Sequence, residues 1–97
     1  MRRSAIVWLP EAIAEKDDLL DYIAERNVLA ALAVDAHIEQ QVGQLVEFPF
    51  LGRKGRIANS FELVISCTPY LVAYQIHGAQ VQILHVFHER RNWPPEH

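Results

Sequence analysis

The chain has 97 residues, of which 51% are hydrophobic, and its formal net charge at pH 7 is −3. This length predicts one domain, spanning residues 1–97, with enough apolar material for a core. The single cysteine, Cys67, excludes an internal disulfide and a cysteine-rich metal cluster. No apolar run approaches the ~20 residues that a membrane-spanning helix needs. Because no apolar segment follows the basic N-terminus either, we expect a cytoplasmic protein without a signal peptide.

Charge is unevenly distributed along the chain. Residues 1–47 hold four basic and nine acidic side chains, whereas residues 48–97 hold five basic and three acidic ones. A protein dedicated to nucleic-acid binding usually has a dense basic face. Here the positive charge is confined to the C-terminal half and is thin, which weighs against a mechanism that needs many phosphate contacts.

The first half of the chain predicts a strand and two helices. Residues 4–9 form a short β-rich run that ends at Pro10, a residue well tolerated in the first turn of a helix. A helical pattern then runs to about Arg26, and Asn27 is expected to separate it from a second helix that ends near residue 48. Because the link is short, the two helices should form an antiparallel hairpin.

The expected buried faces of these helices follow from the spacing of apolar residues. In the first helix they are Ala12, Ile13, Leu19, Leu20 and Ile23, while Glu15, Lys16 and the aspartates cover the solvent face. In the second helix they are Ala31, Val34, Ile38, Val42 and Leu45.

The second half of the chain predicts a loop and three strands. Residues 49–60 contain two glycines and a proline and read as a loop. Strands are expected at 61–66, 70–77 and 80–88, with a tight turn at residues 77–79. Both faces of the last strand are apolar, so we expect it to lie inside the sheet. Helices segregated from a run of strands, in the order β-α-α-β-β-β, indicate an α+β fold.

Candidate functional residues gather first in the loop. Arg53, Lys54 and Arg56 are cations that either clamp phosphates or an acidic protein surface, or stay solvated and cap the second helix. No histidine or cysteine spacing indicates a metal site, and no glycine-rich phosphate loop is present.

A second group of candidates lies where the last strand ends. His88, with Arg90 and Arg91 beside it, can act as an acid–base group next to phosphate-binding arginines. For His85 we favour a half-buried position in the sheet. Trp93, in a Trp-Pro-Pro tail, either folds back on the core or anchors a partner.

Taken in order, several stretches resemble the RelE/ParE family of toxins, often called plasmid-stabilisation proteins. They include Trp-Leu-Pro-Glu-Ala at 8–12, the stretch 21–27, the loop 48–56, the strand segments 62–64, 69–74 and 81–88, and Arg-Asn-Trp-Pro at 91–94. No single stretch is specific, but the ordered set spans nearly the whole chain.

The resemblance implies a RelE-like fold, in which the helical hairpin packs on a twisted antiparallel sheet. It also implies a cognate antitoxin that folds over the toxin and neutralises it, with no cofactor, no metal and no small-molecule substrate. Two activities occur in the family. ParE-like members inhibit DNA gyrase and thus replication, whereas RelE-like members are ribosome-dependent endoribonucleases that cut mRNA.

Two positions depart from the common pattern of the family, because Phe61 and His85 stand where many relatives carry arginine, and these losses weaken the case for a ribonuclease. Together with the acidic charge, they favour the ParE-like branch. The target-binding residues would then be Arg53, Lys54, Arg56, Arg90, Arg91 and Trp93. The alternative is an endoribonuclease in which His88 is the acid–base group and Arg56 and Arg90 stabilise the phosphate. The sequence alone leaves open whether the protein is an enzyme.

Overall fold

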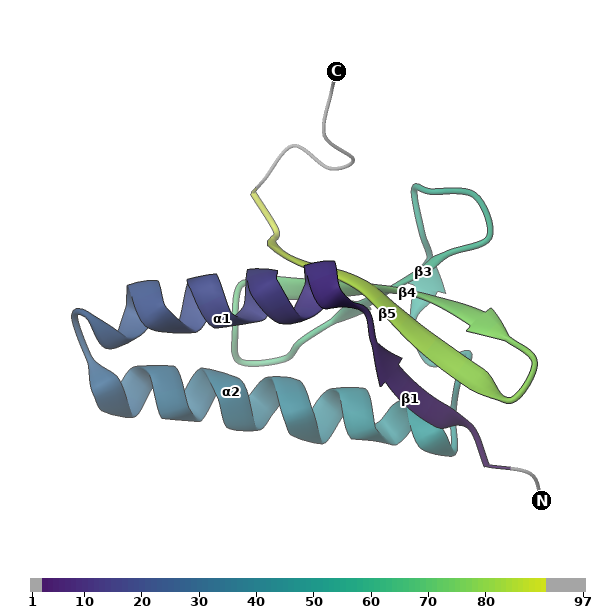
Figure 1. Ribbon diagram of the computed structural model, residues 1–97, viewed down its shortest axis with the longest axis horizontal. Coiled ribbons are helices and arrows are strands. Elements are labelled where there is room, and N and C mark those ends of the chain that lie inside the picture. Colours follow the sequence, from purple (N-terminus) through teal and green to yellow (C-terminus); the bar gives the residue numbers. More distant parts are fainter. Residues whose placement is uncertain (1–2, 91–97) are drawn as a thin grey trace.

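The structure is a computed structural model that describes residues 3–90. Two antiparallel helices, α1 (Pro10–Ala24) and α2 (Val28–Gly43), lie side by side and pack on a five-stranded sheet (Figure 1). The strands are β1 (Ala5–Trp8), β2 (Arg53–Lys54), β3 (Phe61–Val64), β4 (Tyr70–His77) and β5 (Gln80–His88). A short 3₁₀ helix, η1 (Gln44–Val46), follows α2. Within residues 3–90, no helix is long and apolar enough to cross a membrane.

The predicted α+β class and helical hairpin are confirmed, but the sheet is mixed rather than wholly antiparallel. Its order is β1-β5-β4-β3-β2, and β1 runs parallel to β5, with Ala5 opposite Gln80 and Trp8 opposite Ile83. These two strands are distant in sequence, so no tight hairpin forces them to be antiparallel. A second difference is β2, because two residues of the predicted loop pair with β3.

The two helices begin and pack for local reasons that the sequence partly shows. The side chain of Asn27 accepts a hydrogen bond from the N–H of Ala30 at 3.0 Å and so caps α2. The predicted apolar seam of α2 is confirmed, with Ile38 and Val42 buried in the core. In α1, however, Ile13 was expected inside and is 47% exposed, because the helix turns the smaller Ala12 toward the sheet.

Lys16 also departs from the expected solvent-facing position. Its Nζ lies 3.0 Å from Oδ1 of Asp35 and 3.4 Å from Oε1 of Glu39, both on α2. The same ammonium lies 5.0 Å from the ring centroid of Trp8 in β1. Lys16 therefore links the two helices to the first strand.

Both faces of the sheet are covered, which determines how the candidate residues are displayed. On the helix face, α1 and α2 pack on the main core, which includes Leu63, Val72 and Val86. On the outer face, Ile57 from the loop before β3 packs on a smaller cluster of Leu71, Ala73 and Phe87. As predicted, β5 lies inside the sheet, between β1 and β4.

Candidate functional site

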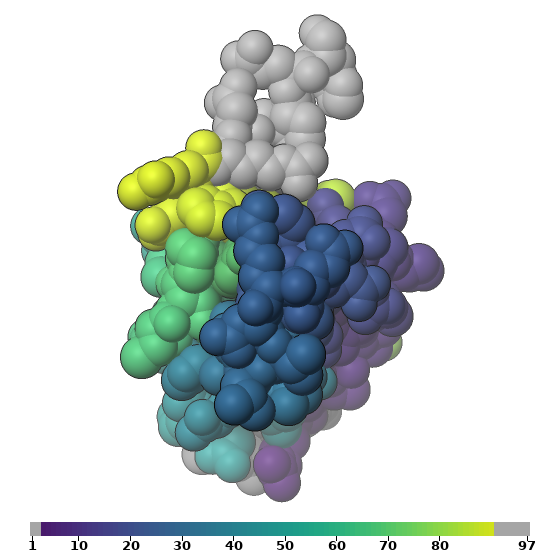
Figure 2. Space-filling view, turned by 90° about the vertical axis from the view of Figure 1, so that its left-hand side faces the viewer, coloured from purple at the N-terminus to yellow at the C-terminus, as the bar shows by residue number. Residues whose placement is uncertain are grey.

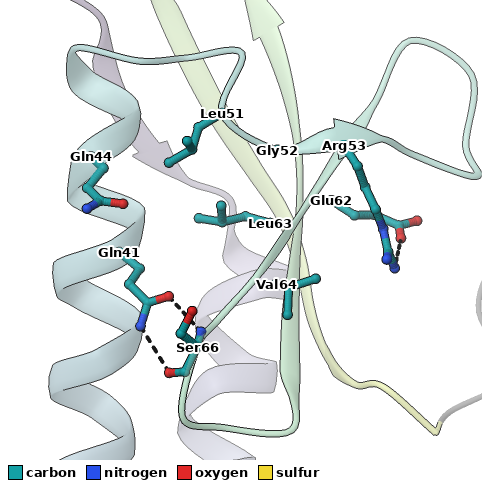
Figure 3. Close-up of a pocket in the computed structure, with 9 residues that line it drawn as sticks. All are labelled: Gln41, Gln44, Leu51, Gly52, Arg53, Glu62, Leu63, Val64 and Ser66. Atoms are coloured by element: carbon teal, nitrogen blue, oxygen red, sulfur yellow. Dashed lines mark hydrogen bonds and ion pairs between the residues drawn. The ribbon is translucent and has the colours of Figure 1, made fainter.

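A buried carboxylate on β3 holds two of the predicted functional arginines. The side chain of Glu62 is 1% exposed, and its Oε1 lies 3.2 Å from Nη2 of Arg53 (Figure 3). Its Oε2 lies 3.6 Å from Nε of Arg56 and accepts the backbone N–H of Arg56 at 3.1 Å. A buried carboxylate is costly unless it is paired and hydrogen-bonded. Both oxygens of Glu62 meet that condition.

Although they bind Glu62, the two arginines still present positive charge to solvent. The side chain of Arg53 is 56% exposed and that of Arg56 is 42% exposed. Lys54, next to Arg53 on β2, is exposed as well. Two arginines on one carboxylate give this basic cluster, Arg53, Arg56 and Glu62, a positive balance. Such a surface suits an acidic group of a partner.

Tyr74 fixes the loop that leads into the basic cluster. Its hydroxyl donates to the carbonyl of Pro49 at 2.8 Å and accepts the N–H of Gly52 at 2.9 Å. A Cβ on residue 52 would lie only 2.7 Å from that hydroxyl, so glycine permits the close approach. Burial raises the pKa of Tyr74, and the hydrogen bond from Gly52 partly offsets this rise.

His88 lies at the other end of the sheet, in a different setting. It is paired with Tyr70 across β4 and β5, and the two rings meet edge to face at 5.6 Å. Its Nδ1 accepts the backbone N–H of Arg90 at 3.0 Å, so the neutral ring carries its proton on Nε2. Glu15 and Asp18 also line the adjacent hollow, which measures about 380 Å³.

This end of β5 lies beside the helical hairpin and the β3–β4 turn, as Figure 2 shows from the end of the molecule. Burial and the nearby Tyr22 raise the pKa of Tyr70, which lines the same hollow. Among the described residues, those that line the hollow beside His88 include two tyrosines and two carboxylates.

The basic cluster and His88 lie on opposite faces of the sheet. Successive residues of a strand face opposite sides. Val72 and Val86 form a cross-strand pair in the helix-face core, so the Tyr70–His88 pair two residues away also faces the helices. Leu63 packs in the same core, so its neighbour Glu62 faces outward. The structure thus brings Arg53 and Arg56 together, but it does not bring Arg56 to His88.

The remaining predicted residues are placed as follows. Arg90 follows β5, exposed, and meets His88 through its backbone. Arg91 and Trp93 lie outside the described residues. Among residues 3–90, no group of three or more histidine, cysteine, aspartate or glutamate side chains could hold a metal ion.

His85 is half-buried, as expected, and it leads to a residue that the sequence reasoning missed. Its Nδ1 lies 3.1 Å from Oε1 of Glu15 on α1. The same oxygen accepts the backbone N–H of Val86 at 3.1 Å. Because β1 pairs with β5 only as far as Ile83, Glu15 takes the place of a missing strand at Val86. Its position on a helix gave no signal of this role.

Glu62 was also missed, although the sequence did contain a signal. It is an acidic residue inside an apolar strand, and three cations precede it within ten residues. A charge in such a run needs a partner when it is buried.

A family model described as the ParE toxin of the type II toxin–antitoxin system parDE matches residues 6–93. The chain belongs to the ParE toxin family. A Sinorhizobium fredii protein named as a toxin, Y4kP, is 38% identical over 94 residues, which cover 97% of each chain. Toxin RelE2 of Caulobacter vibrioides is 30% identical over 88 residues, 89% of this chain and 96% of that one.

A solved structure titled as the chromosomal ParDE system of P. aeruginosa shares the fold of this ParE-family toxin. The TM-score is 0.80 at 22% identity, and the match covers 91% of this chain and 98% of the other. This ParE/RelE-type toxin therefore has the two-helix, five-stranded architecture of a ParDE chain.

Proposed function

We propose that this toxin stops growth by binding DNA gyrase and inhibiting replication, without catalytic chemistry of its own. The observation that carries the proposal is the separation of Arg56 from His88, two of the groups that an endoribonuclease would combine. Arg56 is held by Glu62 on the outer face, whereas His88 faces the helices beside Glu15 and Asp18. RNA cleavage would need cations next to the acid–base group, because they stabilise the negative charge of the phosphate in the transition state. The acidic residues beside His88 disfavour a phosphate there.

The surface that would contact gyrase includes the exposed cations Arg53, Lys54, Arg56 and Arg90, and we extend it to Arg91 and Trp93 of the C-terminal segment. The basic cluster is anchored by a buried carboxylate, so its charges are presented at fixed positions. Ordered cations lose less conformational entropy when they bind a partner.

Supercoiling by purified gyrase tests the proposal. The toxin should inhibit it, and Lys54→Glu combined with Arg90→Glu should raise the inhibitory concentration at least ~10-fold by reversing two exposed charges. Arg26→Glu, at the far end of α1, is the matched control and should change little. If gyrase is unaffected while mRNA is cleaved in a translating extract, and His88→Ala abolishes the cleavage, the ribonuclease alternative replaces this proposal.

We further propose that a cognate antitoxin neutralises the toxin in the cytoplasm, and that the pair serves in plasmid stabilisation. Support comes from the ParDE title of the structural neighbour and from the exposed apolar side chains of the toxin. These include Tyr22, Leu29 and Leu32 near the hairpin turn and Phe50 and Leu51 before β2. Co-purification with the product of the adjacent small gene tests the pairing. Free toxin in the presence of that product would contradict it.

A further inference from the structure

The segment 48–51, between η1 and β2, is apolar but lies at the surface. Phe48 is 61% exposed, Phe50 is 71% exposed and Leu51 is 50% exposed. Together with Pro49 they line part of a hollow of about 390 Å³. Single exposed apolar side chains are common in soluble proteins, but a contiguous group of them marks an interaction site. We call this segment the apolar loop.

Hydrogen bonds fix the backbone of the apolar loop. The hydroxyl of the buried Tyr74 donates to the carbonyl of Pro49 and accepts the N–H of Gly52. Inside the loop, the N–H of Leu51 donates to the carbonyl of Phe48 at 3.1 Å and closes a turn. A backbone that is already ordered loses little conformational entropy when it binds a partner. The exposed side chains of the loop are therefore presented at fixed positions.

Contacts between aromatic rings place the side chain of Phe50. Its ring meets that of Phe61 edge to face, with the ring centroids 5.7 Å apart and the planes at 78°. Phe61 in turn stacks on Tyr74, with the centroids 5.4 Å apart. The rings therefore form a row from the core to the surface, and Phe50, at the outer end, remains largely exposed. An exposed aromatic ring that is supported in this way suits the centre of a protein interface.

Lys54 supplies a cation on the same face of the sheet as these rings. The β2–β3 register pairs Lys54 with Phe61, and directly opposed residues of two strands share a face. The exposed side chain of Lys54 therefore lies on the side of Phe61 and Phe50. The next pair, Arg53 and Glu62, points to the side of β3 away from α2, as Figure 3 shows. The apolar loop thus has a positive charge beside it that no carboxylate of the basic cluster offsets.

We propose that Phe50 is the apolar anchor of the surface that binds gyrase, and that it enters an apolar pocket of gyrase with a carboxylate at its rim. The inference rests on the proposed binding of gyrase. The apolar loop leads directly into β2, whose cations are already part of that surface, and the carboxylate at the rim binds Lys54. A second copy of the toxin is a poorer occupant, because a symmetric contact at this loop would bring two Lys54 side chains together.

Binding to purified gyrase, measured together with inhibition of supercoiling, tests the anchor. Phe50→Ala should raise both the dissociation constant and the inhibitory concentration at least ~10-fold, because it removes an aromatic side chain from the centre of the interface. Phe50→Leu keeps an apolar side chain and should stay within about threefold of the unmodified toxin. Because the ring is largely exposed and the hydrogen bonds of Tyr74 to the loop remain, both variants should fold, which circular dichroism checks.

Val28→Ala is the matched control, since Val28 is an apolar residue, 61% exposed, at the other end of α2. It should change gyrase binding less than about twofold. The loss caused by Phe50→Ala should persist when the salt concentration is raised, whereas the loss caused by Lys54→Gln should shrink, because salt screens charges and not apolar contacts.

Hydroxyl-radical footprinting of the unmodified toxin, read by mass spectrometry, tests the same contact without a substitution. Bound gyrase should lower the oxidation of Phe50 at least ~3-fold, because the ring is removed from solvent. Oxidation of Val28 should not change.

The outcomes distinguish this inference from the proposed function. If the unmodified toxin neither binds nor inhibits gyrase, the proposed function is wrong and the inference falls with it. If the toxin inhibits gyrase but Phe50→Ala is equally potent, or Phe50 stays equally reactive in the complex, the anchor is wrong and the proposed function stands. If Phe50→Ala weakens binding to the antitoxin, or self-association of the toxin, while gyrase binding is unchanged, the apolar loop has another occupant and the inference is overturned.

Discussion

The two carboxylates at opposite regions of the sheet, Glu62 and Glu15, hold the fold in the same way but with opposite electrostatic balance. Each accepts a backbone N–H from a segment without a strand partner at that position, Arg56 in one case and Val86 in the other. Glu62 also pairs with two guanidiniums, those of Arg53 and Arg56. At Glu15 the additional partner is His85, and a second carboxylate, Glu11, lies 3.9 Å from the same ring.

This difference teaches where the protein can meet an anion. Around Glu62 two arginines outnumber the one carboxylate, so this surface attracts an acidic group of a partner. Around Glu15 the acidic groups predominate, so a phosphate or carboxylate is repelled. Net charge, which is negative for the whole chain, hides this division between the outer face and the end of β5.

The largest expected effect comes from removing the buried carboxylate. Glu62→Ala should lower the free energy of unfolding by about 3 kcal/mol, because the N–H of Arg56 loses its acceptor and two guanidiniums lose their partner. Urea unfolding followed by circular dichroism measures it.

Glu47→Ala is the matched control for this substitution. Glu47 pairs with Arg3 at 3.7 Å, but both side chains are well exposed, so the cost should stay within about 0.5 kcal/mol. Equal costs for the two substitutions would mean that Glu62 does not hold the loop.

A smaller effect is expected at the acidic end. Glu15→Ala should lower the free energy of unfolding by about 1 kcal/mol, since it leaves the partly buried N–H of Val86 without an acceptor. Glu15→Gln should cost less, because the amide oxygen can still accept from Val86. The same unfolding measurement ranks the two variants. Equal losses for glutamine and alanine would show that charge, and not the hydrogen bond to the strand, is what matters at Glu15.

The sequence predicted the helices and strands well, but it did not predict the structural roles of Glu15 and Glu62, and the reason is physical. Burial of Ile38 and Val42 follows from the helical period, which is a local property of the chain. The roles of Glu15 and Glu62 depend on where a distant strand stops. β1 ends at Trp8 and leaves Val86 to be capped from α1. Only the folded structure shows that this position of β5 lacks a neighbouring strand.

Placement of the functional candidates shows the same limit. The cluster of Arg53 and Arg56 is visible in the sequence, but their shared partner is not. The sequence also suggested that Arg56 could join His88, and only the alternation of β3 and β5 about the sheet separates them. Residues distant in sequence are assigned to one face only when the strand register is known.

The smallest effect is expected from ionisation of the tyrosines in the two regions, and it should appear only in alkali. Burial raises the pKa of Tyr74 above its ordinary value of 10.0, so the folded state keeps a proton that the unfolded chain releases. The resulting stability is fully present below pH 10.0 and is lost as the pH rises through the folded pKa of Tyr74. The free energy of unfolding should therefore be lower when it is measured above that pH than when it is measured below it.

Comparison with Phe variants assigns this alkaline loss to a region. Tyr74→Phe lowers stability at all pH values because the hydroxyl bonds to Pro49 and Gly52 are lost, but it should reduce the decline above pH 10.0. Tyr70→Phe is the matched variant at the β5 end, where burial and the nearby Tyr22 raise the pKa. Since Tyr74 is buried and Tyr70 only half-buried, Tyr74→Phe should flatten the decline more. The reverse ranking would mean that ionisation of Tyr70, and not of Tyr74, limits stability in alkali.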